Sequence, residues 1–161
     1  MTPLAERLWQ SRRDGGNVIV AEDETPKTIE EAIAIQRAAI ECSGMPSIGF
    51  KVGSTSAEAQ KVLKTNEPGA SPVLSGFLHT SPATISIVTA HGPAVEGEFA
   101  LSIGEDLPAR DTEYSFEEVF QAIDGVAAAI EVVGTRLAGG LAIAGGPALV
   151  SRLSVGADRL G

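Results

Sequence analysis

Two glutamates one residue apart interrupt an apolar run, residues 95–101, and they restrict how this part of the chain can fold. The run alternates as a β-strand does, so Glu96 and Glu98 point to the same face, about 6 to 7 Å apart along the strand. Gly97 leaves the opposite face bare. On this pair alone, a carboxylate site and the wet face of a half-solvated antiparallel strand are equally good interpretations.

A third glutamate favours the carboxylate site. Glu131 lies within residues 126–133, an apolar run that predicts a buried strand, and no basic residue follows before Arg136. An isolated buried carboxylate is very costly unless something compensates its charge. We therefore expect a hard divalent cation to gather Glu96, Glu98 and Glu131, and ligands that are all oxygen indicate Mg²⁺ or Mn²⁺ before Zn²⁺.

Composition limits the class of protein. The 161 residues, of which 43% are hydrophobic, suffice for one domain with a core, and the formal net charge of −9 argues against nucleic acid or an anionic membrane as a partner. Cys42 is the only cysteine, so a reducing cytoplasm is the expected compartment. Residues 1–7 do not have the apolar core of a secretory signal, and neither uncharged run, 68–95 or 137–151, has the character of a membrane span.

Helix signals open the chain. Pro3 and an apolar stripe predict a first helix from residue 4, and a capping box of Thr28 and Glu31 begins a second one. Gln36 falls within the inward stripe of the second helix, which indicates either a hydrogen-bonded core position or a misread helix phase. Residues 48–58 then predict a short strand that turns into a helix capped by Thr55.

The end of that strand is a possible place for an acid. Lys51 supplies a cation just before the turn, and the exposed N–H groups of a helix start attract anions, although this segment alone favours a surface lysine before an ordinary capped helix. Strands are predicted at residues 73–79 and 84–88. We expect His91 to be solvent-accessible without a role, whereas the role of His79 stays open.

A capping box at Ser115 begins a later helix, which leads into the strand that contains Glu131. The buried stripe of this helix is expected to consist of Phe116, Val119, Phe120 and Ile123. Helices, then strands, then a helix and a strand indicate an α+β fold rather than a regular βαβ alternation.

Three motifs in order resemble those of the 2-keto-4-pentenoate hydratase branch of the fumarylacetoacetate hydrolase superfamily. They are the sequence GFKVGSTS at residues 49–56, the Glu-Gly-Glu of residues 96–98, and IEVVGTR at residues 130–136. Residues 31–36 also resemble the N-terminal helix of that family, and the agreement runs from about residue 4 to residue 140. Three motifs in order are far more specific than any one of them.

The resemblance implies a mixed β-rich roll with N-terminal helices, formed by residues 1–140, followed by a divergent or truncated tail, residues 141–161. Family members continue well beyond this length, so the roll is expected to be incomplete at its C-terminal end. It also implies a homo-oligomer of unknown order and a small-molecule substrate.

The implied activity is that of a metal-dependent hydro-lyase. It would add water to a 2-hydroxydienoate or 2-oxoenoate, such as 2-keto-4-pentenoate, in the catabolism of aromatic compounds. Glu96, Glu98 and Glu131 would hold Mg²⁺ or Mn²⁺, Lys51 would be the family lysine that moves a proton, and Lys51, Ser54 and Thr55 would bind the acid.

Other interpretations stay open. A 2-oxo acid decarboxylase or a carbon–carbon hydrolase of the same family would need the same stabilised enolate, and a catalytically inactive, truncated metal-binding remnant would keep the carboxylates without turnover. A purely structural role for all three glutamates ranks last, because it leaves the burial of Glu131 unexplained.

Overall fold

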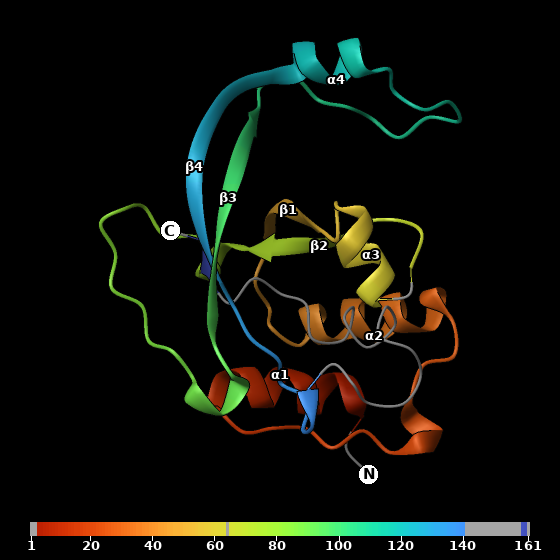
Figure 1. Ribbon diagram of the computed structural model, residues 1–161, viewed down its shortest axis with the longest axis vertical. Coiled ribbons are helices and arrows are strands. Elements are labelled where there is room, and N and C mark those ends of the chain that lie inside the picture. Colours follow the sequence, from red (N-terminus) through yellow and green to blue (C-terminus); the bar gives the residue numbers. More distant parts are fainter. Residues whose placement is uncertain (1–2, 64, 141–158, 161) are drawn as a thin grey trace.

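The structure, a computed structural model, describes residues 3–63, 65–140 and 159–160 (Figure 1). Two helices occupy one end of the molecule, two antiparallel sheets stand above them, and helix α4 lies at the far end (Figure 1). This arrangement of helices and antiparallel sheets confirms the predicted α+β class. Within the described residues, no helix has both the length and the apolar character that a membrane span requires.

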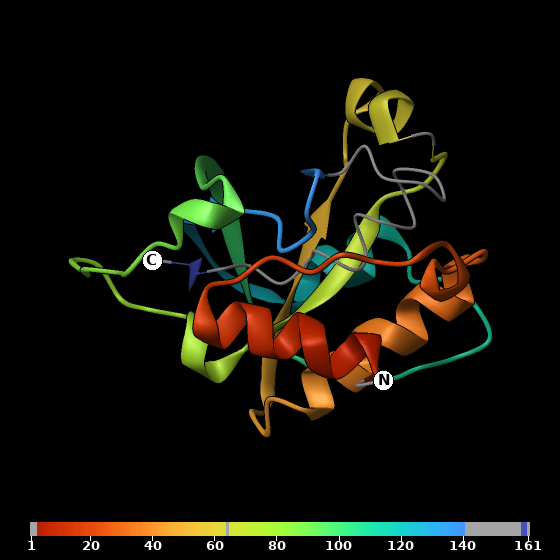
Figure 2. The ribbon, with the colours of Figure 1, turned by 90° about the horizontal axis from the view of Figure 1, so that it is seen from below.

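Helices α1 (Leu4–Asp14) and α2 (Ile29–Glu41) lie side by side, as Figure 2 shows from below, with the short 3₁₀ turn η1 (Glu22–Glu24) between them in the chain. The hydroxyl of Thr28 accepts a hydrogen bond from the Glu31 N–H, which confirms the cap of α2, but the Glu31 side chain accepts from the Lys27 N–H and does not complete the predicted capping box. The core cluster at this end of the molecule joins α1 to two distant segments and consists of Leu4, Leu8, Val18 and Leu137.

The first sheet pairs β1 (Ser47–Gly53) with β2 (Gly69–Leu74), and α3 (Ala57–Leu63) lies between them in the chain. The predicted cap of α3 is wrong by one residue, because it is Ser56, not Thr55, whose hydroxyl accepts the N–H of Ala59, at 3.1 Å. The predicted strand 73–79 is also misplaced. The chain pairs earlier, from Gly69, and then bends through the 3₁₀ turn η2 (Ser75–Phe77).

The second sheet has the order β3-β4-β5. Its long hairpin joins β3 (Ala94–Ile103) to β4 (Ile123–Val133) through a loop and α4 (Phe116–Ala122), and it rises away from α1 and α2 (Figure 1). Strand β5 (Arg159–Leu160) pairs with β4 at Glu131 and Val132. The rest of the predicted tail, residues 141–158 and 161, lies outside the described residues.

The hairpin corrects two predictions of burial. Strand β4 was expected to be buried. Glu131 is the one buried residue of the strand, however, and Val126 and Ile130 are more than half exposed. The expected stripe of α4 is also wrong, because Phe116 and Phe120 are exposed and stack on each other with ring centroids 5.9 Å apart. An apolar pattern predicts that other segments pack against these side chains, but none of the described residues buries them.

Three smaller predictions are decided by packing. Gln36 is buried and hydrogen-bonded, so the helix phase was read correctly. His91 is buried rather than solvent-accessible, because the 3₁₀ turn η3 (Thr89–His91) brings its Nε2 to 2.9 Å from the Gly16 carbonyl. Residues 84–88 form no strand, and they have no ladder partners among the described residues.

Candidate functional site

Pairing of β3 with β4 brings the three glutamates to one face of the hairpin. Glu96 is directly opposite Glu131, and Glu98 is opposite Ala129, one step further along the same face. One carboxylate oxygen of each glutamate lies within 4.8 Å of those of the other two. Side chains 33 or more positions apart in sequence therefore meet because the ladder has this register.

The three carboxylates have unequal surroundings. Glu131 is 3% exposed, whereas Glu96 and Glu98 are exposed. The ammonium of Lys51, which projects from β1, lies 2.8 Å from Glu131 Oε1, and the side chain of Lys51 is itself only 18% exposed. The cluster is thus closed on the side of β1 and open on the side of β3.

The ion pair changes the argument about Glu131. No basic residue was expected close to it, yet the fold supplies Lys51 from 80 positions away in sequence. Burial of Glu131 alone therefore does not require a metal. What does favour a cation is the remaining charge: three carboxylates and one ammonium leave a formal charge of −2 within the group, and Glu96 and Glu98 have no ion-pair partner among the described residues.

Ser54 and Thr55 follow Lys51 at the turn from β1 to α3. Ser54 has a positive φ of 58°, and its carbonyl accepts a hydrogen bond of 2.9 Å from the side chain of Gln60. In the described part of the chain, no hydrogen bond joins the side chain of Ser54 or Thr55 to the glutamates. The structure thus brings Lys51 to the cluster and leaves the two hydroxyl residues beyond it.

Comparisons with known proteins find similar sequences and similar structures. No family model matches the chain. The 2-keto-4-pentenoate hydratase of Paraburkholderia xenovorans LB400 is 32% identical over 148 residues, which cover 86% of this chain and 54% of that protein. The TodF product hydratase of Pseudomonas putida F1 is 28% identical over 137 residues, which cover 83% of this chain and 50% of that protein.

The chain is a homologue of the 2-keto-4-pentenoate hydratases. This confirms the resemblance that its motifs indicate, and it rests on a match that spans about half the length of the curated relatives.

Two solved structures show the same fold. They are of the 4-oxalocrotonate decarboxylase of Pseudomonas putida G7, one complexed with calcium and acetate and one with magnesium and adipate. The first has a TM-score of 0.78 at 20% identity and the second a TM-score of 0.73 at 19% identity. Each match covers 98% of this chain and 59% of the solved chain.

The sequence did not predict the hydrogen-bonded pair of Ser71 and Gln36, which lies next to Lys51. Ser71 is the cross-strand partner of Lys51 in the β1–β2 ladder, and Gln36 of α2 donates a hydrogen bond of 3.0 Å to the Ser71 hydroxyl. Both side chains are buried. The helical pattern predicted the inward position of Gln36, but it could not predict that Ser71 is the hydrogen-bond partner.

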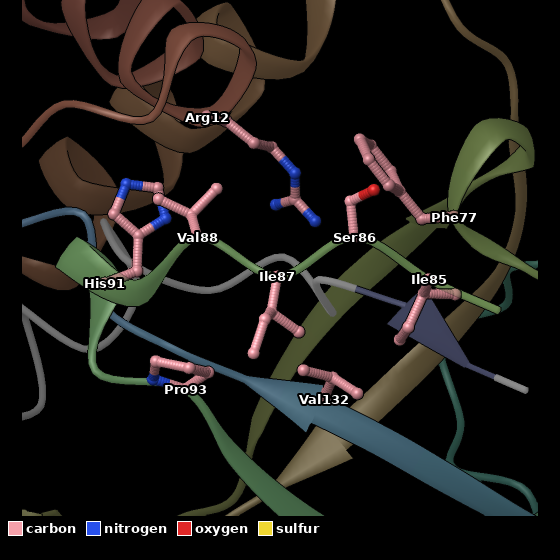
Figure 3. A pocket seen from close by; sticks show the side chains of 9 residues that line it. All are labelled: Arg12, Phe77, Ile85, Ser86, Ile87, Val88, His91, Pro93 and Val132. Carbon is pink, nitrogen blue, oxygen red and sulfur yellow. The ribbon is translucent and has the colours of Figure 1, made fainter.

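A pocket of about 50 Å³ lies on the opposite side of β4, where Val132 forms part of its wall (Figure 3). Arg12 points into it from α1 with its guanidinium carbon 4.0 Å from the centroid of the Phe77 ring, and Ile87 and Pro93 line the other side (Figure 3). The pocket is separate from the glutamate cluster.

Proposed function

We propose that this chain takes part in the hydration of a short 2-hydroxydienoic or 2-oxoenoic acid, of the 2-keto-4-pentenoate type, in the catabolism of aromatic compounds. The observation that carries the proposal is the convergence of Glu96, Glu98 and Glu131 within 4.8 Å beside the ammonium of Lys51. The homologous hydratases, which share 28 to 32% identity with the chain, support it.

Glu96, Glu98 and Glu131 would hold the cofactor, a divalent metal that we propose to be Mg²⁺ or Mn²⁺. Their oxygen-only donor set and the net formal charge of −2 fit a hard dication. When bound, such an ion supplies a Lewis acid that polarises substrate oxygens and stabilises negative charge that develops on them. The solved decarboxylase structures, one complexed with calcium and acetate and one with magnesium and adipate, support this assignment.

Lys51 would act on the acid itself. Its ammonium stands at the edge of the carboxylate cluster, where it can attract the substrate carboxylate and hold or release a proton at Nζ while the dienol tautomerises. Ser54 and Thr55 would add hydroxyl donors for the carboxylate at the end of β1. Water then adds across the conjugated double bond and gives a 4-hydroxy-2-oxo acid.

The experiment is a spectroscopic assay of the whole chain. A dienoate substrate loses its ultraviolet absorbance on hydration, so we expect the absorbance to fall when protein and Mg²⁺ are present together. Glu96→Gln should abolish the change, whereas Glu105→Gln, which removes the same charge from an exposed position outside the cluster, should not. No turnover at high protein concentration would contradict the proposed hydration.

Three alternatives to hydration remain candidates. The solved relatives are decarboxylases, so release of CO₂ from a 2-oxo acid would instead assign decarboxylation to the same cluster, and carbon–carbon hydrolysis would give two smaller acids. A metal-binding protein without turnover is a further candidate, because the three carboxylates suffice to hold a cation. Calorimetric binding of Mn²⁺ by a chain that has no activity would identify that case.

We further propose that the chain works as a homo-oligomer in the cytoplasm and that its hairpin belongs to a β-rich roll. The exposed, unpaired thiol of Cys42 suits a reducing compartment. The similarity to the decarboxylase structures supports the roll.

A further inference from the structure

Lys51 and Glu131 form an ion pair in which one partner is held and the other can move. Glu131 lies in the middle strand of its sheet, where β4 pairs with β3 at Glu96 and with β5 at Leu160, and its side chain is 4% exposed. Lys51 belongs to the other sheet and reaches the carboxylate through a long, flexible stem. A change at this contact would therefore move the ammonium of Lys51 and leave the carboxylate of Glu131 in place.

The Glu131 carboxylate takes part in two arrangements. Its Oε1 atom accepts a hydrogen bond of 2.8 Å from Lys51 Nζ. One of its oxygens also lies within 4.8 Å of an oxygen of Glu96 and of an oxygen of Glu98, so that one cation could contact all three side chains. No ion pair joins Lys51 to Glu96 or Glu98 in the part of the chain that the structure describes. Lys51 thus neutralises the buried member of the cluster and not the two exposed ones.

A divalent cation and the ammonium would make opposing demands on Glu131. Both are positively charged, so they repel each other when they share one carboxylate, and the burial of this side of the cluster limits the screening of that repulsion by water. The dication carries twice the charge of the ammonium and can contact three carboxylates instead of one. Of the two contacts to Glu131, that of Lys51 is therefore the weaker.

We propose that Lys51 is an internal competitor for the metal at Glu131, and that binding of a divalent cation by the three glutamates releases its ammonium from the ion pair. This inference rests on the metal site of the proposed function and adds its regulation. The ion pair lowers the affinity of the cluster for the metal, and the metal weakens the ion pair by the same factor, because coupling between two binding events is reciprocal. The ammonium becomes available to a substrate carboxylate only after the metal has bound, so the metal and the acid bind in that order.

The first test follows the wild-type chain by NMR while Mg²⁺ alone is added. An ammonium that is shielded in an ion pair exchanges its protons with water slowly and gives a proton–nitrogen signal of its own. We expect the Nζ signal of Lys51 to disappear as Mg²⁺ fills the cluster, at the concentration at which the carboxyl signal of Glu131 shifts. Lys61 is exposed on α3 and serves as the internal control, because the carbon signals of its side chain should not move.

The second test measures the reverse effect by calorimetry with Mn²⁺. Lys51→Met keeps most of the side chain without its charge and should bind Mn²⁺ about tenfold more tightly than the wild type. Lys61→Met is the matched control, since it removes the same charge from an exposed position on α3, and its affinity should be unchanged. Lys51→Arg keeps the competing charge, so its affinity should stay close to that of the wild type.

The proposal is overturned if Lys51→Met binds Mn²⁺ no more tightly than the wild type, or if the Nζ signal persists when Mg²⁺ saturates the cluster. In either case Lys51 and the metal would share Glu131 without competition, and the proposed hydration would stand. If the wild-type chain binds no Mn²⁺, the metal site of the proposed function fails together with this inference. The NMR measurement needs no variant and decides the question if Lys51→Met does not fold.

Discussion

The Nζ atom of Lys51 lies 2.8 Å from Oε1 of Glu131, and this ion pair joins the two sheets of the protein. Both side chains are largely shielded from water, with exposed fractions of 18% and 4%. Because the pair connects β1 to β4, it fixes the position of the carboxylate cluster relative to the turn that carries Ser54 and Thr55.

Lys51→Met should destabilise the protein, because it leaves a buried carboxylate without its cation. Breaking a buried pair from one side typically costs about 3 kcal/mol or more of unfolding free energy. Urea unfolding at pH 7 in the presence of a chelator measures this cost. Lys61→Met removes the same charge from an exposed position on α3 and should stay within about 0.5 kcal/mol of the wild type. An equal loss of unfolding free energy in the two variants would mean that the ion pair of Lys51 with Glu131 does not stabilise the protein.

Leu8→Ala tests the core beneath the helices. Leu8 is fully buried on α1 against Val18 and Leu137, so its truncation should leave a cavity and cost about 3 kcal/mol of unfolding free energy. Leu78→Ala is the control, since Leu78 is 51% exposed, and its cost should be well below that of Leu8→Ala. Thermal or urea unfolding compares the two, and a similar cost for both would contradict the assigned core.

Local features of the fold were predictable from the sequence. The caps at Thr28 and Ser115 are present with their partners Glu31 and Glu118, because each depends on residues three positions apart in the chain. The shared face of the first two glutamates follows in the same way from strand geometry.

Features that depend on distant segments were not predictable. The apolar run of β4 indicated burial, but burial depends on what packs against the strand, and the described residues leave Val126 and Ile130 exposed. The partner of Glu131 is Lys51 and not a neighbour in sequence, since the ion pair exists only once the two sheets meet. One cap was shifted from Thr55 to Ser56 because adjacent hydroxyl residues offer the helix nearly equivalent starts.

The pH dependence of the α4 region follows from Glu118. Two hydrogen-bonded nitrogens of Arg110 and the backbone and hydroxyl of Ser115 lower the pKa of this carboxyl to about 2 from 4.5. A lowered pKa in the folded state means that the contribution to stability is complete above about pH 4.5 and is lost as the pH falls towards 2. A carbon-13 NMR titration of the carboxyl measures the value directly.

Arg110→Met should raise the pKa of Glu118, because the arginine is the largest cause of its lowering. Arg13→Met is the matched control: Arg13 pairs with Asp14 at the end of α1, so the titration of Glu118 should not change. A Glu118 pKa that does not move in Arg110→Met would assign the lowering to the cap at Ser115 alone.

The hydrogen bond between Gln36 and Ser71 should support the strand that carries Lys51. Both side chains are buried, and Ser71 is the direct cross-strand neighbour of Lys51, so removing either partner breaks a hydrogen bond inside the protein. We expect Ser71→Ala and Gln36→Leu each to cost about 1 to 3 kcal/mol of unfolding free energy. The double variant should cost less than the sum of the two, with a coupling energy of about 1 kcal/mol in a urea-unfolding cycle. Additive losses would show that the two side chains do not stabilise each other.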